Sequence, residues 1–237
     1  MLLLFLAAVA ASSEAPRVLG ACPGFGTRGR DARGLVYFAA GENNLHKAFK
    51  SVASLRSLGD KTHATLFTDG AGFATLEARG YAFLGLFDCA VCALNASLAV
   101  RPRHRADEGC RFANCKRAEI VALRGGKQRA MLVAASTMYD ALLFVDADTL
   151  FCAAGAVDAA FAPLGDGADV AVAPARKSHE EKALVAALGE RARLLPEPNT
   201  GVLPLRASAR TVALLELWTR ACVVGRDISP PDFLSRI

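Results

Sequence analysis

Aromatic residues are scarce in this sequence, and long hydrophobic runs are missing. Aromatic side chains make up 7% of the 237 residues, with one tryptophan, and they do not alternate with basic residues as in proteins that stack on nucleobases. The apolar N-terminal stretch Met1–Ala11 is shorter than the about 20 residues that a membrane-spanning helix needs. We therefore expect neither a nucleic-acid partner nor a transmembrane helix.

The charge balance is mild as well. Lysine and arginine number 28 against 23 aspartate and glutamate residues, an excess that suits an anionic small molecule or an acidic surface. With 53% apolar and 22% charged residues, the chain is globular rather than disordered. Its length allows one large domain or at most two.

The first 33 residues read as a leader followed by a linker. Met1–Ala11 is typical of the hydrophobic region of a signal peptide, with cleavage options at Ala8–Ala11 but without preceding basic residues. A buried N-terminal strand is the alternative. We expect residues 1–33 to be a signal peptide and linker and residues 34–237 to be the folded domain. This predicts a secretory location (ER or Golgi lumen, or secreted), with a cytoplasmic one as the alternative.

Four of the seven cysteines fall in one irregular stretch of the sequence. They are Cys89, Cys92, Cys110 and Cys115. In an oxidising compartment these residues could form two disulfides, the interpretation that we favour. A zinc cluster with loose spacing and free buried thiols are the alternatives, and the odd count leaves at least one thiol unpaired. We expect Cys152, after the central strand, to be buried.

The stretch Ala141–Leu150 is the most informative part of the chain. Five apolar residues run into Asp146 and Asp148, the one Asp-x-Asp in the sequence, as in a strand buried on both faces. Side chains alternate along a strand, so both carboxylates are predicted to point the same way. Two hard oxygen ligands suit Mg²⁺ or Mn²⁺, which in turn suits a diphosphate. A turn after the strand is the alternative.

A strand–helix–strand unit precedes this stretch. We predict a strand over 35–40, a helix that Asn43 or Asn44 caps and that ends at Gly59, and a strand over 64–68 followed by Asp69. Such a crossover is right-handed and makes the strands parallel. Asp69 and Gly41 should therefore lie at the same edge of the sheet as Asp146.

The remaining elements are predicted from shorter patterns. We expect a third strand over 81–87, an irregular region over 88–118, a helix over 125–139 whose first turn carries Lys127 and Arg129, and a strand over 169–173. Cations in the first turn of a helix oppose the helix dipole, so they are either exposed or directed at an anion. Asn199 and Gly201 then lead into a further apolar strand, and a helix begins at Ser208.

These patterns, taken in order, resemble a known family over roughly residues 35–220. The stretches that carry the resemblance are 35–39, 65–69, 127–140, 143–150 and 199–202. The sequence resembles the nucleotide-diphospho-sugar transferases, which are glycosyltransferases of the GT-A fold, and is more distantly similar to glycogenin-like enzymes. The resemblance implies an α/β fold with a Rossmann-like, mostly parallel sheet flanked by helices.

The resemblance also implies an activity and its partners. It implies a metal-dependent glycosyltransferase that moves a sugar from a nucleotide-diphospho-sugar, most simply a UDP-sugar, to a protein, glycan or lipid acceptor. Asp148 would bind Mn²⁺ or Mg²⁺, and Asp146 would contact the ribose and the metal. Asp146, Asp148 and Asn199 form the catalytic set that we predict.

The same resemblance places other residues around the donor. Ala39, Gly41 and Asp69 would line the nucleotide pocket. Lys127 would reach the diphosphate or the donor sugar, and Gly201 with Asn199 would border the donor sugar or the acceptor.

Some features depart from the family pattern. Glycogenin-like enzymes use a late histidine as a metal ligand, but none of the four histidines here follows residue 200. Either the chain is truncated or water supplies the third ligand. Two alternatives therefore stay open. A nucleotidyltransferase would need a glycine-rich, arginine-containing loop after the first strand, and residues 41–44 do not form such a loop. A non-catalytic binding protein would tolerate the missing metal ligand.

Overall fold

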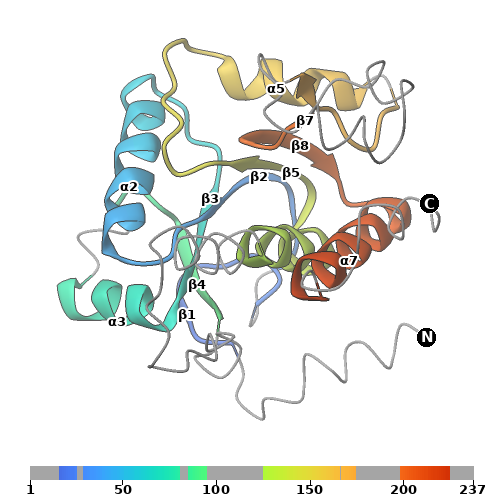
Figure 1. Ribbon diagram of the computed structural model, residues 1–237. Helices are drawn as coiled ribbons and strands as arrows, with labels where there is room; N and C mark the ends of the chain where they lie inside the picture. The colour runs from blue at the N-terminus through green and yellow to red at the C-terminus, as the bar shows by residue number, and fades with distance from the viewer. Residues whose placement is uncertain are drawn as a thin grey trace, which may run out of the picture.

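The protein is an α/β structure built on a six-stranded sheet. The computed structural model describes residues 16–25, 29–80, 85–94, 125–165, 167–174 and 198–224, which Figure 1 shows in colour. The sheet has the order β1-β4-β3-β2-β5-β8. Its strands are β1 (Val18–Gly20), β2 (Asp31–Phe38), β3 (Ala64–Asp69), β4 (Cys89–Leu94), β5 (Tyr139–Val145) and β8 (Val202–Arg206).

The four central strands are parallel, and the two outer ones are antiparallel to their neighbours. Strand β2 pairs in parallel with both β3 and β5, and β3 pairs in parallel with β4. Strands β1 and β8 pair antiparallel with β4 and β5. The predicted Rossmann-like, mostly parallel sheet is therefore confirmed. Strand β1 and the start of β2 come from the segment for which the sequence predicted a linker.

Helix α2 (Glu42–Ser57) makes the predicted crossover between β2 and β3. Its apolar stripe of Leu45, Ala48, Val52 and Leu55 is buried, which covers one face of the sheet. Gly59 has φ of 80° just after the helix, as a helix stop requires. The predicted asparagine cap is wrong, because Gly41 occupies the cap position and makes no side-chain bond.

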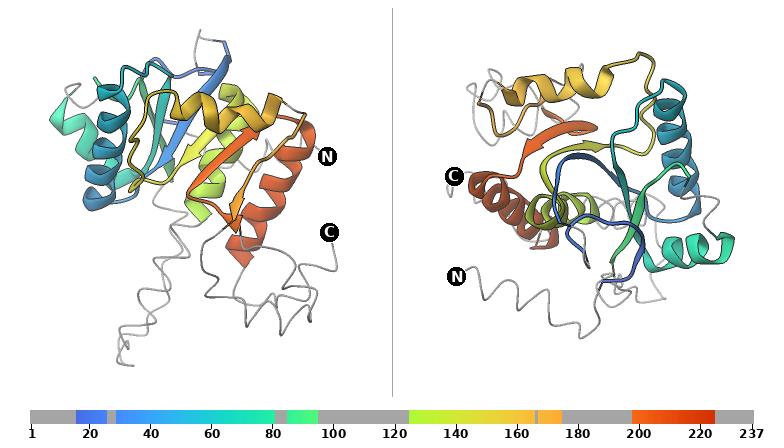
Figure 2. Two further views of the ribbon diagram at one scale, coloured as in Figure 1. Left: turned by 90° about the horizontal axis from the view of Figure 1, so that it is seen from above. Right: turned by 180° about the vertical axis from the view of Figure 1, so that it is seen from behind.

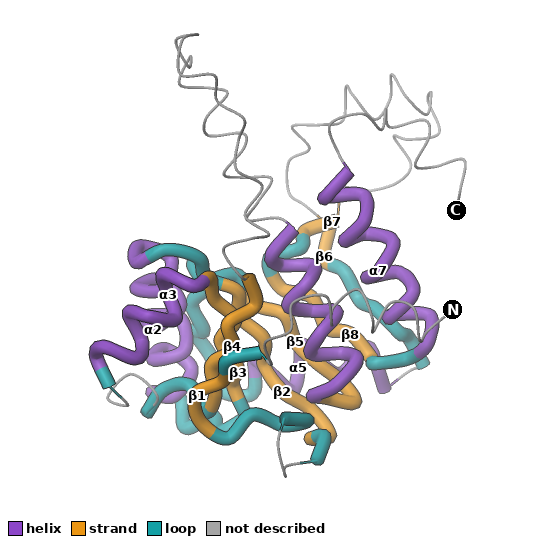
Figure 3. The backbone as a smooth tube through the Cα atoms, turned by 90° about the horizontal axis from the view of Figure 1, so that it is seen from below, coloured by secondary structure: helices purple, strands orange, loops and turns teal. Residues whose placement is uncertain are grey.

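Helices cover both faces of the sheet (Figures 2 and 3). Helices α2, α3 (Gly70–Arg79) and α5 (Ala156–Gly165) pack on one side, and α7 (Ala209–Val224) with the helix over 125–133 and the π-helical turn η3 (Ala134–Met138) pack on the other. Along β5, Leu142 and Phe144 join one core cluster while Leu143 and Val145 join the other. No helix among the described residues is long and apolar enough to cross a bilayer.

Two predicted strands differ in the structure. Of the strand predicted over 81–87, residues 81–84 lie outside the described residues and 85–87 are not a strand, whereas β4 lies in the stretch that the sequence predicted to be irregular. Phe87 turns inward here, with ring centroids 5.3 Å from Tyr37 and 5.4 Å from Phe49, so this segment packs as a loop against α2. The predicted strand over 169–173 is replaced by a single bridge from Val170 to Leu205 and by β6 (Ala173–Pro174), which pairs with β7 (Pro198–Asn199).

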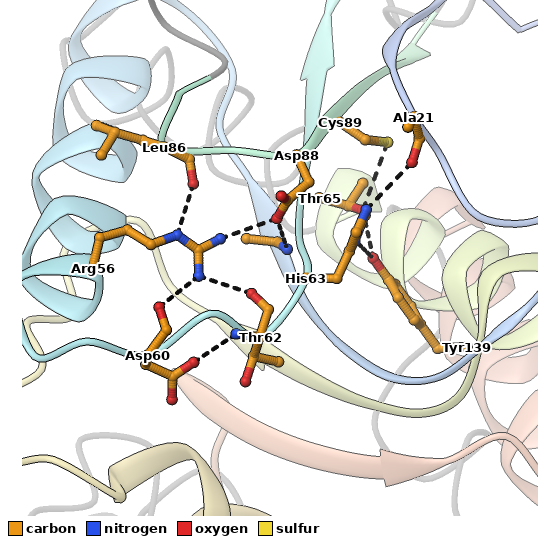
Figure 4. Close-up of polar contacts among 11 residues, drawn as sticks. Ala21, Arg56, Asp60, Thr62, His63, Thr65, Leu86, Asp88, Cys89 and Tyr139 are labelled. Atoms are coloured by element: carbon orange, nitrogen blue, oxygen red, sulfur yellow. Dashed lines mark hydrogen bonds and ion pairs between the residues drawn. The ribbon is translucent and has the colours of Figure 1, made fainter.

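A guanidinium group whose side chain is 19% exposed holds the amino-terminal edge of the parallel strands (Figure 4). Arg56, at the end of α2, donates hydrogen bonds to the backbone carbonyls of Leu86, Asp60 and Thr62 at 3.1, 3.0 and 2.9 Å. It also pairs at 3.0 Å with Asp88, whose carboxylate accepts a bond from the amide at the start of β3. One side chain therefore joins α2, β3 and the loop before β4.

A disulfide lies near this edge. Cys22, which follows β1, is bonded to Cys89 at the start of β4, and both residues are buried. Cys89 therefore cannot belong to the zinc cluster that was an alternative, and its partner lies outside the stretch in which we predicted the disulfides. Cys110 and Cys115 lie outside the described residues. Cys152 is exposed, contrary to the prediction.

Loss of the Arg56 side chain should destabilise the protein strongly. Arg56→Ala removes the ion-pair partner of Asp88 and the hydrogen-bond donor to three carbonyl groups, which predicts a loss of about 1–3 kcal/mol in the free energy of unfolding. Arg210→Ala is the matched control, because Arg210 is 86% exposed in its ion pair with Asp169 and should change stability by less than about 1 kcal/mol. Urea denaturation measures both. Equal effects of the two changes would contradict this role for Arg56.

The disulfide should contribute measurably to stability. Removing it in the double variant Cys22→Ser and Cys89→Ser frees a connection of 67 residues, for which we expect a loss of about 2–5 kcal/mol. Cys152→Ser, at an exposed position, should stay within about 0.5 kcal/mol of the wild type. Thermal melting with and without a reductant provides the measurement. A wild-type melting temperature that a reductant leaves unchanged would argue against the bond.

Candidate functional site

The carboxyl ends of β2 and β5 meet at the point where the strand order of the sheet reverses. From β2 the chain proceeds through α2 to β3 on one side, whereas β5 has β8 on its other side. The register places Tyr37 opposite Val145, so the residues after both strands leave the sheet at the same edge. In open α/β sheets this crevice is where ligands bind.

Asp146 and Asp148 lie in a turn at this edge. Strand β5 ends at Val145, and the Thr149 amide donates to the Asp146 carbonyl at 3.0 Å. The strand is thus shorter than predicted, and strand alternation does not determine the direction of Asp148. The side chain of Asp146 is 25% exposed, and Asp148 is exposed. Both carboxylates can therefore be reached from solvent.

Lys127 lies against the first of these carboxylates. Its ammonium group forms an ion pair with Asp146 Oδ1, and its own side chain is 28% exposed. The ammonium also lies 5.8 Å from the centre of the Phe144 ring. Phe144 and Asp146 are two positions apart at the end of β5. Because residues two apart in a strand lie on the same face, the sequence could have indicated that Phe144 lies next to the site.

Gly126 brings this lysine to the sheet. A Cβ atom at Gly126 would lie 2.1 Å from Cζ of Phe38, so the first turn of the helix over 125–133 touches the end of β2 through a glycine. Arg129 is two residues further on and thus about 200° around the helix from Lys127. Burial lowers the pKa of Arg129. Of the two predicted cations, Lys127 is therefore the one that faces the carboxylate.

Asp69 joins the ends of β2 and β3. Its Oδ1 accepts bonds from the amides of Gly72 at 2.9 Å and Gly41 at 3.3 Å, which caps α3 and holds the loop after β2. The neighbouring Thr68 hydroxyl donates to the Ala39 carbonyl at 2.7 Å. The structure thus brings Ala39, Gly41 and Asp69 together. Thr68 was not among the predicted residues, although its position at the end of a strand was a usable signal.

The predicted residues Asn199, which ends β7, and Gly201, which follows it, are only partly described. The Asp146 amide donates to the Gly201 carbonyl at 2.7 Å, which places Gly201 beside the acidic turn. The backbone of Asn199 pairs with Ala173, and its side chain lies outside what the structure describes. The role of Asn199 stays a prediction.

The donor atoms of the acidic turn fit a hard divalent cation. Asp146 and Asp148 supply carboxylate oxygens at a solvent-accessible edge, and Mg²⁺ in particular is often held by one or two carboxylates together with substrate phosphates and water. Among the described residues, no group of three or more histidine, cysteine, aspartate or glutamate side chains is placed to hold a metal ion. The two carboxylates suit a cation whose other ligands are phosphate oxygens and water.

A hollow of about 450 Å³ lies between α2 and α3, away from the acidic turn. Leu45, Phe49 and Leu76 provide its apolar lining, and Glu42 and Arg79 form a 2.8 Å ion pair at its rim. Its lining includes neither Asp146 nor Lys127. The hollow is therefore separate from the candidate site.

No family model and no curated protein matches the chain. Among solved structures it is similar to mouse xyloside xylosyltransferase 1 in the apo form, at 14% identity and a TM-score of 0.49, with 82% of this chain and 74% of that one covered. It is also similar to the galactosyltransferase LgtC in complex with donor and acceptor sugar analogues, at 14% identity, TM-score 0.45 and coverage of 85% and 69%.

The apo structure of the bifunctional glycosyltransferase WbbM is a third similar structure. Its identity to the chain is 12% and its TM-score is 0.44, with 87% of this chain but 36% of WbbM covered. All three are glycosyltransferases of the GT-A type, and the likeness is one of fold at low sequence identity.

Two adjacent glycines test whether close packing positions Lys127. Gly126→Ala should lower the free energy of unfolding by about 1–3 kcal/mol, because the new methyl group overlaps the Phe38 ring. Gly125→Ala should be neutral or stabilising by up to about 1 kcal/mol, since no described residue lies within 4 Å of its Cβ position. Chemical denaturation measures the free energy of unfolding of both variants. Similar values for the two would show that the helix does not rest on Phe38 as described.

Proposed function

We propose that the protein is a metal-dependent glycosyltransferase that uses a nucleotide-diphospho-sugar donor. The observation that carries the proposal is the pairing of Lys127 with Asp146 beside the exposed Asp148, at the carboxyl edge where the strand order reverses. A diphosphate leaving group needs positive charge beside it, which a cation held by these carboxylates and the Lys127 ammonium group would supply. A UDP-sugar is the donor that we propose to test first.

Each part of the site has a role in this reaction. Asp146 and Asp148 would hold Mn²⁺ or Mg²⁺, which when bound neutralises the negative charge that develops on the leaving diphosphate. Lys127 would add a positive charge from the helix side. The loop from Ala39 to Gly41, held by Asp69, would form the wall for the nucleotide. Gly201 permits close approach of a sugar to the backbone.

We also propose that the protein folds in the secretory pathway. The buried Cys22–Cys89 disulfide supports an oxidising compartment, because such bonds are rare in the cytosol. The apolar segment Met1–Ala11 supports the same location as a signal-peptide region.

A non-catalytic nucleotide-sugar-binding protein is the second candidate. The described residues offer two carboxylates at the acidic turn and no cluster of three metal-binding side chains. Such a site could hold a donor with its cation without transferring the sugar. Binding and turnover must therefore be measured separately.

Binding of UDP in the presence of Mn²⁺ should depend on Asp148. We expect calorimetry to show metal-dependent UDP binding by the wild type and a loss of about 10- to 100-fold in affinity for Asp148→Ala, since a removed carboxylate ligand costs at least as much as a lost supporting contact. Asp158→Ala is the control, because Asp158 is an exposed carboxylate of α5 in an ion pair with Arg33. It should bind UDP like the wild type.

Two outcomes separate the candidates. Release of UDP from one member of a panel of UDP-sugars, together with metal-dependent binding, supports the transferase. Metal-dependent binding without release from any sugar favours the binding protein. Absence of metal-dependent heat in the wild type would rule out both for this nucleotide and overturn the proposal.

A further inference from the structure

Lys127 and Asp146 form an ion pair at the place where a cation would bind. The two side chains are 28% and 25% exposed, so the pair is more shielded from water than an ordinary surface pair. The Phe144 ring lies beneath the ammonium group, which further limits access of water from that side. Because screening by solvent and salt is weaker at such a site, the charge of Lys127 must strongly affect any other cation nearby.

The pair changes the charge that a metal ion meets. Asp146 and Asp148 together carry two negative charges, but Lys127 neutralises one of them in the structure. A divalent cation that arrives alone must displace the ammonium group from Asp146 or bind close to it. Either event costs free energy through lost attraction or through repulsion between like charges. The acidic turn should therefore bind a free divalent cation weakly.

The lysine side chain can change partner without movement of its helix. Gly126 lies close against Phe38, so the backbone just before Lys127 packs on the end of β2. The ammonium group is at the end of a flexible four-carbon chain and acts as a point charge without a required bonding plane. It can therefore turn from Asp146 toward a second anion within its reach.

We infer that Lys127 is an exchangeable counter-ion. It holds Asp146 when the donor is absent and moves to the diphosphate when the donor and its cation arrive, which leaves Asp146 to the metal. This inference rests on the proposed function, because it needs a diphosphate as the second anion. The metal replaces Lys127 as the partner of Asp146, and the diphosphate becomes the new partner of Lys127. The inference therefore predicts that metal and nucleotide increase each other's affinity, because such coupling is reciprocal.

The test compares Mn²⁺ binding with and without UDP in the full chain. Free Mn²⁺ is measured from its electron paramagnetic resonance signal, and UDP binding at saturating Mn²⁺ by calorimetry. For Lys127→Gln we expect the affinity for Mn²⁺ alone to rise about three- to tenfold, because a repelling charge is removed. The affinity for UDP with Mn²⁺ should fall about tenfold, because the diphosphate loses a cation.

Two further variants serve as controls. Lys127→Arg keeps the positive charge and should bind Mn²⁺ alone as weakly as the wild type. Arg129→Gln removes an equal charge from the opposite side of the same helix, and should leave both affinities within about twofold. Circular dichroism of each variant checks that it is folded.

The opposite changes in the two affinities distinguish this role from a merely structural one. A Lys127→Gln protein whose affinity for Mn²⁺ alone is unchanged or lower would overturn the inference, while metal-dependent UDP binding by the wild type would leave the proposed donor site intact. A wild type that shows no metal-dependent UDP binding would overturn the proposed function, and the inference with it.

Discussion

The parallel pairing of β2 with β5 is the constraint on which the rest of the structure depends. Leu35 and Leu143 lie opposite each other in this pairing and are fully buried, with core clusters on both faces of the sheet. A shift of one residue in this register would turn apolar side chains of one strand toward the wrong cluster. The same register fixes the positions at which the loop after β2 and the acidic turn leave the sheet.

The two edges of the sheet differ in what their polar groups do. At the amino-terminal edge, the groups around Arg56 and Asp88 are paired with one another, and the Cys22–Cys89 bond ties nearby segments together. At the carboxyl edge, Asp148 is exposed, and Asp146 is held by a lysine. Stabilising interactions at one edge support a rigid sheet, and this rigidity allows the other edge to present groups to a ligand.

The candidate site is assembled from segments far apart in the sequence. Lys127 reaches Asp146 because a glycine lets its helix rest on Phe38, and Gly201 reaches the same aspartate through a backbone hydrogen bond. These contacts explain why charges from distant segments lie close together at this edge of the sheet. Under the proposed function, the cation and the diphosphate would complete this site together, and their affinities would then be linked.

The sequence alone determined the elements whose signals are local. Helix α2, strand β3 and the apolar run before Asp146 follow from periodicity and from Gly59, because a stripe or an alternating pattern reflects which side of one element is buried. Tertiary structure decided the location of β4, the partner of Cys89, the turn that carries Asp148 and the contact of Lys127 with Asp146. These depend on contacts between residues distant in the chain, and a local pattern contains no information about which distant residue will lie beside it.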